Sequence, residues 1–187
     1  MIGIDEVGRG CWAGPLLVVA ARQKGALPER LKDSKKLSKK TRENVYEQIL
    51  ALCEYGEGWV SAREIDELGL SAAMRVGVKR ALDAIRAAND EDIIMDGLVN
   101  YCDEIFEQVR CIARADDLFP VVSAASVYAK VTRDQYMYSL KERYALYEFD
   151  RHVGYGTKLH AELILKHGVT DQHRLSFAPL QKYVSSE

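Results

Sequence analysis

The sequence predicts an α/β fold, and two observations carry that prediction. Short apolar runs, of the kind that form buried strands, alternate along the chain with longer segments in which apolar residues recur every three or four positions, as they do in helices. The chain has 187 residues and contains no internal repeat and no low-complexity linker. Because one domain usually spans roughly 100 to 200 residues, we expect a single domain over residues 1–187.

Composition excludes several classes of protein. The longest apolar runs, such as Leu16–Ala21, are far shorter than the ~20 residues of a membrane span, and the first residues do not resemble a secretion signal. The four cysteines contain no C-x-x-C pair, which argues against a zinc site or a disulfide framework. The formal net charge of -2 argues against coating of nucleic acid by bulk electrostatics, although it allows a local basic surface. We expect a cytoplasmic monomer without membrane contact.

Residues 1–22 predict a β-hairpin. Residues 1–7 and 12–22 are apolar enough for two strands, and the segment Gly8-Arg9-Gly10 between them permits a sharp turn. The second strand is a continuous apolar run, which is typical of a strand covered on both faces.

Two adjacent carboxylates, Asp5 and Glu6, stand where the first strand should be buried. Moving a carboxylate out of water costs several kcal/mol unless a cation or hydrogen-bond donors compensate. A bound cation is the simplest resolution, and Arg9 adds a planar fork of donors that suits phosphate. The alternative is a tight hairpin whose acids are solvated near the chain end.

Residues 31–42 form a basic stretch in which lysine and arginine outnumber the single acid Asp33. This composition predicts either a solvated loop or a phosphate-binding edge, where Ser34, Lys35 and Lys36 would hold a phosphate. Thr41 predicts the cap of a helix that runs to about residue 53.

Further elements follow in the middle of the chain. Residues 57–60 predict a short strand, and Ser61-x-x-Glu64 is a capping-box pattern that should start a helix. A second helix start at Ser71 opens a longer helix to about Ile85, with apolar residues at helical spacing.

The next strand, residues 93–95, ends in the carboxylate of Asp96. In open α/β sheets, ligands gather outside the carboxyl ends of strands, so Asp96 is a candidate site residue. Residues 110–113 predict another strand, and residues 121–144 predict a long buried helix. Asp116 lies just before that helix, where it could also merely complement the helix dipole.

The last part of the chain, residues 150–177, is rich in histidine and contains an aromatic turn. Its histidines are His152, His160, His167 and His173. Their irregular spacing matches no familiar zinc pattern, so we expect exposed or hydrogen-bonded side chains. Tyr155 stands between two glycines, where an accessible ring can stack on a sugar or a base.

Motifs from residue 2 to about residue 179 resemble those of one family, in the family's order. They are GIDEVGRG followed by AGP, DSKKLS, the strand-end MDG, RADDLFPVVSAASVYAKVTRD, and HVGYGTKLH followed by HRLSF. Each motif alone would be weak evidence, but the ordered set is similar to the type 2 ribonucleases H, and specifically to ribonuclease HII. The intact Gly-Arg-Gly segment, without the long amino-terminal extension of ribonuclease HIII, favours HII.

The resemblance implies a ribonuclease H-like fold, with a central mixed five-stranded sheet flanked by helices and a helical carboxyl-terminal part from about residue 147. It implies that the active site and its metal ligands are Asp5, Glu6, Asp96 and Asp116. Asp117 stands beside the last of these, but the family's basic-small-Asp pattern favours Asp116. The implied cofactor is Mg²⁺ or Mn²⁺, with two ions clamping the scissile phosphate when substrate is bound.

The implied activity is that of an endoribonuclease. It would cleave the RNA strand of RNA/DNA hybrids and incise on the 5′ side of single ribonucleotides embedded in duplex DNA, leaving 5′-phosphate and 3′-hydroxyl ends. Its role would be ribonucleotide removal and RNA primer removal. In the family, the Gly-Arg-Gly segment contacts the 2′-hydroxyl and a tyrosine packs on the sugar, which assigns substrate binding to Gly8, Arg9, Gly10 and Tyr155.

Some features depart from the family pattern or leave alternatives open. Cys11 and Trp12 stand where small or aliphatic residues are more familiar, and they could alter the floor of the substrate groove. The tail QKYVSSE contains no convincing clamp-binding motif, so the sequence does not support a sliding-clamp partner. The alternatives are a different nuclease on the same fold, acting on long hybrids or DNA junctions, and a nucleic-acid-binding module whose acids hold a structural ion.

Overall fold

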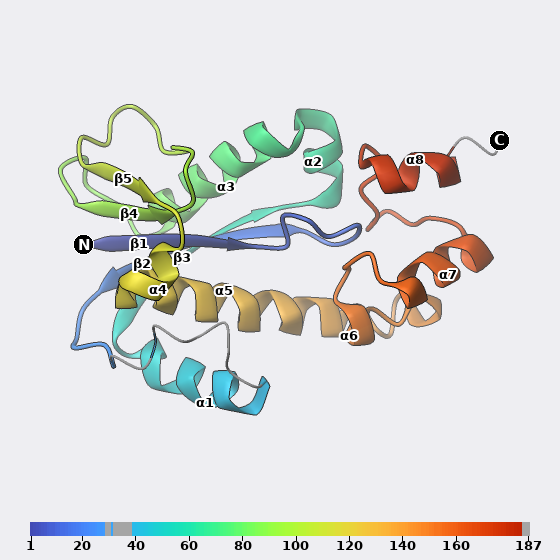
Figure 1. Ribbon diagram of the computed structural model, residues 1–187, viewed down its shortest axis with the longest axis horizontal. Helices are drawn as coiled ribbons and strands as arrows, with labels where there is room; N and C mark the ends of the chain where they lie inside the picture. The colour runs from blue at the N-terminus through green and yellow to red at the C-terminus, as the bar shows by residue number, and fades with distance from the viewer. Residues whose placement is uncertain (29–30, 32–38, 185–187) are drawn as a thin grey trace.

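The computed structural model describes residues 1–28, 31 and 39–184, and it confirms the mixed five-stranded sheet (Figure 1). The strands are β1 (Ile2–Val7), β2 (Leu16–Gln23), β3 (Cys53–Val60), β4 (Ile93–Asp96) and β5 (Val109–Ile112). Their order across the sheet is β3-β2-β1-β4-β5. β1 pairs antiparallel with β2, as the predicted hairpin requires, and parallel with β4, so it occupies the centre of the sheet.

Helices cover both faces of the sheet (Figure 1). One face carries α2 (Ala62–Leu68) and α3 (Leu70–Ala84), and the other carries α5 (Pro120–Ser139) with α1 (Lys39–Leu50) beyond it. Because side chains alternate along a strand, β2 contributes to both apolar cores. Leu16 and Val18 pack in the core under α3, whereas Leu17 and Val19 pack in the core under α5.

Gly3 allows α5 to lie directly on β1. A Cβ atom at this position would be 2.6 Å from the backbone of Val121 and Val122, at the start of α5. Asp5 is two residues beyond Gly3 in β1, and Ser126 is five residues beyond Val121 in α5. Both steps cover roughly 7 Å, given the rise per residue of a strand and of a helix. Asp5 and Ser126 therefore meet across the same interface, where their side chains form a hydrogen bond.

The carboxyl-terminal part is helical, as predicted, and lies beyond the end of the sheet toward which β1 runs (Figure 1). It consists of a 3₁₀ turn (Ala145–Tyr147), α6 (Phe149–His152), α7 (Lys158–His167) and α8 (Ala178–Val184). In the part of the chain that the structure describes, no helix is long and apolar enough to cross a membrane.

The sequence predicted that the second strand begins at Trp12, but it begins at Leu16. The intervening backbone bonds to the carboxyl-terminal part instead of continuing the strand. The N–H of Trp12 donates to the carbonyl of Gly154 at 2.8 Å, and that of Gly14 donates to the carbonyl of Gln172 at 2.8 Å. Residues 8–15 therefore form a hairpin loop that joins the sheet to the carboxyl-terminal part.

Other predicted boundaries also shift. β3 begins at Cys53 rather than at residue 57, because residues 53–60 pair in register with the whole of β2. Thr41 lies within α1 and is not its cap. The long helix α5 ends at Ser139 rather than at Tyr144, and a 3₁₀ turn follows. α3 and β5 each begin one residue earlier than predicted.

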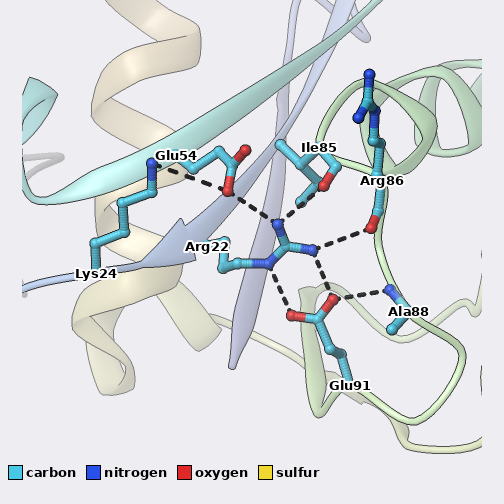
Figure 2. A network of polar contacts seen from close by, with 7 residues as sticks. All are labelled: Arg22, Lys24, Glu54, Ile85, Arg86, Ala88 and Glu91. Atoms are coloured by element: carbon cyan, nitrogen blue, oxygen red, sulfur yellow. Dashed lines mark hydrogen bonds and ion pairs between the residues drawn. The ribbon is translucent and has the colours of Figure 1, made fainter.

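An ion-pair network fastens β2 to the connection between α3 and β4 (Figure 2). The guanidinium group of Arg22 donates to both carboxylate oxygens of Glu91, at 2.8 and 2.6 Å, and to Glu54 of β3 at 2.9 Å. It also donates to the backbone carbonyl of Ile85 at 2.9 Å. Because Arg22 pairs with Ile2 in the hairpin, this network lies at the opposite end of β1 from the hairpin loop.

The predicted capping box at the start of α2 is confirmed. The Ser61 hydroxyl accepts from the N–H of Glu64 at 3.2 Å, and the Glu64 carboxylate accepts from the N–H of Ser61 at 2.9 Å. Arg80 of α3 also donates to Glu64 at 2.7 Å. The hydrogen bond from Arg80, followed by those from Ser61, lowers the pKa of Glu64 to about 2.

We expect Glu64→Gln to destabilise the protein at neutral pH and to lose this effect in acid. The folded-state pKa of Glu64 lies below its ordinary value of 4.5, so its stabilising contribution is present above that pH and disappears as the pH falls toward about 2. Urea unfolding of both proteins between about pH 7 and about pH 3 measures the difference. Glu67→Gln, in the same helix, is the matched control because its partner Arg63 is 85% exposed. A difference that does not change with pH would contradict this role.

Candidate active site

A cavity of about 400 Å³ opens where β1 ends, with walls from β1, β4, α1, α5 and the turn after α6. It is lined by Asp5, Glu6, Val7, Arg42, Asp96, Ser126, Val127, Lys130 and Tyr155. Three of the predicted acids and the predicted tyrosine therefore share one cavity, although they come from three distant parts of the sequence.

Asp5 is the most deeply buried of the acids that line this cavity, with 5% of its surface exposed. Burial, followed by the nearby charges of Glu6 and Asp96, raises the pKa of Asp5 to about 8. Hydrogen bonds from the Ser126 side chain and from the N–H of Glu6, at 2.8 Å, act in the opposite direction without cancelling the shift. A carboxyl group in this environment is one that a cation would stabilise in its charged form.

Asp96 links β4 to α4 (Ala115–Leu118). Its carboxylate accepts from the N–H of Ala115 at 2.7 Å, which places the start of α4 against the end of β4. Asp116 follows directly, but it is 1% exposed and does not line the cavity. Asp117 is paired with Arg114, whose Nε donates to it at 2.8 Å. Asp116 therefore directly follows the residue whose N–H binds Asp96, and its side chain is buried.

The donor set of the cavity fits a hard divalent cation. Carboxylate oxygens are the ligands that Mg²⁺ and Mn²⁺ prefer, and Asp5, Glu6 and Asp96 line one cavity. Among the described residues, no three Asp, Glu, His or Cys side chains are grouped closely enough to hold an ion by themselves. Mg²⁺ is usually bound by one or two carboxylates together with water and substrate phosphate.

Arg133 of α5 binds the backbone of the hairpin loop. Its buried guanidinium group donates to the carbonyls of Ala13, Pro15 and Val153 at 3.1, 2.8 and 2.9 Å. A Cβ atom at Gly8 would lie 2.3 Å from Nε of Arg133, and the φ of Gly8 is +87°. Glycine is therefore required at position 8 by packing against Arg133 as well as by its backbone conformation.

Arg174, also buried, anchors the same loop from the carboxyl-terminal part. It donates to the carbonyl of Arg9 at 3.0 Å and twice to the carbonyl of Gly14, at 3.0 and 2.8 Å. Burial lowers the pKa of Arg174 to about 10, so the group stays charged at neutral pH. Together the two arginines bind four carbonyls of the loop backbone, those of Arg9, Ala13, Gly14 and Pro15.

Arg9 and Gly10 lie on the accessible side of this loop. The guanidinium group of Arg9 is 3.5 Å from the carboxylate of Glu6 and donates to the hydroxyl of the buried Tyr101 at 3.4 Å. A Cβ atom at Gly10 would meet no atom within 4 Å. Gly10 therefore faces open space, and packing does not require glycine there.

Tyr155 lies on the cavity wall with 39% of its surface exposed, and the Lys130 ammonium is 5.6 Å from the centre of its ring. The loop that carries Tyr155 packs on Trp12, because a Cβ atom at Gly156 would be 2.1 Å from the indole ring. The indole also lies 5.8 Å from the ring of His160. Trp12 thus supports the Tyr155 loop.

Five residues of the cavity lining were not predicted as site residues: Val7, Arg42, Ser126, Val127 and Lys130. The long helix was predicted to be buried, although Ser126 and Lys130 are four positions apart and so share one face of it. This pair of polar side chains on one helix face was the available signal. The predicted phosphate contacts Ser34, Lys35 and Lys36 lie outside the described residues.

Solved structures of ribonucleases share this fold. The chain matches one in the PCNA:RNase HII complex from Archaeoglobus fulgidus with a TM-score of 0.78 and 25% identity, covering 100% of this chain and 97% of that chain. It also matches Bst-RNase HIII, solved in complex with Mn²⁺, with a TM-score of 0.69 and 22% identity, over 98% of this chain and 68% of that chain. The fold and the acid-lined cavity therefore define a ribonuclease H-like enzyme.

Sequence comparison identifies the family. The family model for ribonuclease HII matches residues 2–180. Ribonuclease HII of Shewanella loihica is 42% identical over 184 residues, which span 96% of this chain and 88% of the relative. The chain belongs to the ribonuclease HII family, and it is an endoribonuclease.

We expect Arg133→Met to destabilise the protein by roughly 3 kcal/mol or more, because three backbone carbonyls would lose their buried donor. Urea or thermal unfolding measures the loss. Arg143→Met is the matched control, since the Arg143 side chain is 74% exposed and its loss should cost less than about 1 kcal/mol. Equal stability of the two variants would show that Arg133 does not anchor the loop.

Proposed function

We propose that this protein cleaves the RNA strand of RNA/DNA hybrids and incises duplex DNA on the 5′ side of a single embedded ribonucleotide, leaving 5′-phosphate and 3′-hydroxyl ends. The observation that carries the proposal is the cavity in which the buried Asp5 lies with Glu6, Asp96, Lys130 and an exposed Tyr155. Such a cavity can neutralise a phosphodiester while an aromatic ring contacts the sugar. This activity would remove ribonucleotides and RNA primers from DNA.

We propose Mg²⁺ or Mn²⁺ as the cofactor, held by Asp5, Glu6, Asp96 and Asp116. The burial of Asp5 beside Glu6 and Asp96 supports this assignment, because a divalent cation would stabilise its charged form. Two such ions, when bound, supply activation of the attacking water and stabilisation of the leaving 3′-oxygen. Asp117 is a weaker candidate than Asp116, since it is already paired with Arg114.

The protein's own cations would bind and orient the phosphate. Lys130, held at 2.8 Å by Asp134, and Arg42 both reach the cavity. Ser126 would orient the carboxylate of Asp5 through their hydrogen bond. In addition, Ser34, Lys35 and Lys36 are proposed contacts to a neighbouring phosphate, because lysine charge and a hydroxyl donor suit that group.

We propose that two segments beside the acids recognise the ribose. The 2′-hydroxyl distinguishes the sugar of a ribonucleotide from that of a deoxynucleotide, so a donor or acceptor must be held where that hydroxyl falls. The backbone of Gly8, Arg9 and Gly10 is fixed by buried arginines, and Gly10 faces open space. Tyr155 would pack on the sugar from the other wall of the cavity.

A DNA duplex that contains one ribonucleotide tests the proposal. We expect incision on the 5′ side of the ribonucleotide in the presence of Mg²⁺ or Mn²⁺, and none with EDTA, because the carboxylates alone repel the phosphate. End-labelled strands resolved on a denaturing gel report the position of the cut. Cleavage of a continuous hybrid but not of this duplex would indicate a nuclease for long hybrids, and binding without cleavage would indicate a binding module.

Asp5→Asn and Asp96→Asn should each lower turnover by roughly 100-fold or more, because each removes a charged oxygen ligand at almost no change in volume. Steady-state cleavage of a hybrid measures the loss, and urea unfolding checks that the fold persists. Asp117→Asn is the control, since Asp117 is paired with Arg114 and is not among the proposed ligands. Near-normal turnover of Asp5→Asn or Asp96→Asn would rule out its role as a metal ligand.

Tyr155→Ala should lower the ratio of cleavage at an embedded ribonucleotide to cleavage of a continuous hybrid by about tenfold, the scale of one lost aromatic stacking contact. The ratio of the two kcat/KM values measures this selectivity. Tyr136→Ala is the control, because Tyr136 is similarly exposed, at 37%, but does not line the cavity. If Tyr155→Ala unfolds instead, Tyr155 has a packing role and the assignment is wrong.

A further inference from the structure

Three histidines form a buried cluster behind the loop that carries Tyr155. The ring centres of His152 and His160 are 4.1 Å apart, and those of His160 and His173 are 5.2 Å apart. All three side chains are buried and none lines the acid cavity. They make the hydrogen bonds that the sequence predicted for histidines in this region, and the pattern of those bonds is directional.

The bonds of His173 and His160 determine which nitrogen of each neutral ring carries the proton. Nδ1 of His173 accepts from the N–H of Thr170 at 2.9 Å, so Nε2 of His173 carries the hydrogen and donates to Nε2 of His160 at 3.1 Å. Nε2 of His160 is therefore the acceptor, and its Nδ1 donates to the carbonyl of Tyr155 at 2.9 Å. A directed chain of hydrogen bonds runs from Thr170 to Tyr155.

His152 binds the N–H of Tyr155, on the opposite side of that residue from its carbonyl. Its Nδ1 accepts from the N–H of Gly154 at 3.2 Å, so its Nε2 donates to the carbonyl of Tyr147 at 2.8 Å. The backbone carbonyl of His152 accepts from the N–H of Tyr155 at 2.9 Å. Both polar backbone groups of Tyr155 are thus bound by a histidine, while the N–H of Thr157 adds a second donor to its carbonyl at 2.8 Å.

The cluster also contacts the hairpin loop. The backbone of His173 forms an isolated β-bridge with Ala13, and the ring of His160 lies 5.8 Å from that of Trp12. The histidine cluster therefore lies between the two segments proposed to recognise the ribose, and it contacts both.

Protonation would break this arrangement. The acceptor nitrogens of His152 and His160 each face an N–H group, so an added proton there would set two donors against each other. Nδ1 of His173 faces both the N–H and the hydroxyl of Thr170, so an added proton there would displace that N–H and turn the hydroxyl into an acceptor. Burial, the main cause, lowers the pKa of His160 to about 3 and that of His173 to about 4, and it also lowers the pKa of His152. The charged groups that face the cluster are Glu148, Asp150 and Arg151 beside His152, and Asp171 beside His173.

We propose that the His173–His160 chain, with His152, is a positioning device that sets the orientation of Tyr155 for ribose recognition and that works only while all three rings are neutral. This inference rests on the proposed function, in which Tyr155 packs on the sugar. The three histidines touch neither the acids nor the phosphate, so they are positioning residues. Their tautomers are Nδ1–H for His160 and Nε2–H for His152 and His173.

Side-chain ¹H–¹⁵N spectra of the full-length wild-type protein test the arrangement without reference to activity. At about pH 7 we expect single neutral tautomers, Nδ1–H for His160 and Nε2–H for His152 and His173. His160 and His173 should keep theirs down to about pH 5.5, where a free histidine would be mostly charged. A charged His160 ring, or one that averages between tautomers in this range, would overturn the proposal.

Two substitutions at one position separate positioning from packing. His160→Asn places an amide N–H close to the former Nδ1 and can still donate to the carbonyl of Tyr155, whereas His160→Gln places its amide near the former Nε2 and loses that donor. We expect His160→Gln to lower the ratio of embedded-ribonucleotide cleavage to continuous-hybrid cleavage about tenfold, and His160→Asn to keep it within about threefold. His167→Gln is the control, because the His167 side chain lies outside the chain of bonds.

The outcomes distinguish this inference from the proposed function. Cleavage of the continuous hybrid should change little, since the acids are untouched. If both His160 variants fold and show the same ratio of embedded-ribonucleotide to continuous-hybrid cleavage, the positioning role is wrong. If neither variant folds, the tautomers in the wild-type spectra decide. Wild-type protein that fails to cut the embedded ribonucleotide would overturn the proposed function, whereas the tautomers would still report whether the hydrogen-bond chain exists.

Discussion

Two buried guanidinium groups determine how the rest of the site is built. A buried charge costs several kcal/mol unless its donors are satisfied, and here backbone carbonyls satisfy Arg133 and Arg174. Those carbonyls belong mainly to the hairpin loop, which would otherwise be a flexible glycine-rich turn. One arginine comes from the long helix and the other from the carboxyl-terminal part, so the loop keeps its shape only when both are in place.

The geometry of the sheet explains why the sequence could predict that Asp5 and Asp96 lie close together. Apolar runs mark β1 and β4, and a carboxylate at the end of an apolar strand is conspicuous because burial makes it costly. Parallel pairing of β1 with β4 then brings Asp5 and Asp96 into one cavity. Local signals of this kind, including the capping box at Ser61, survive in the folded protein because their partners lie close in sequence or on adjacent strands.

Long-range contacts to the backbone could not be predicted in this way. Arg133 and Arg174 bind carbonyls, which every residue carries, so no side-chain pattern marks their partners. For the same reason Trp12 was assigned to a strand, although the backbone that follows it bonds to the carboxyl-terminal part. Ser126 and Lys130 were missed because the long helix was predicted to be buried, whereas these two polar side chains on one of its faces reach the cavity.

The contact between Trp12 and Gly156 has a consequence for sequence change. Because the indole occupies the space that any side chain at position 156 would need, the two positions are not independent. A larger residue at position 156 is compatible only with a smaller one at position 12, so exchanging one loop with a relative requires exchanging the other. Substitutions at positions 12 and 156 should therefore have strongly non-additive effects on stability.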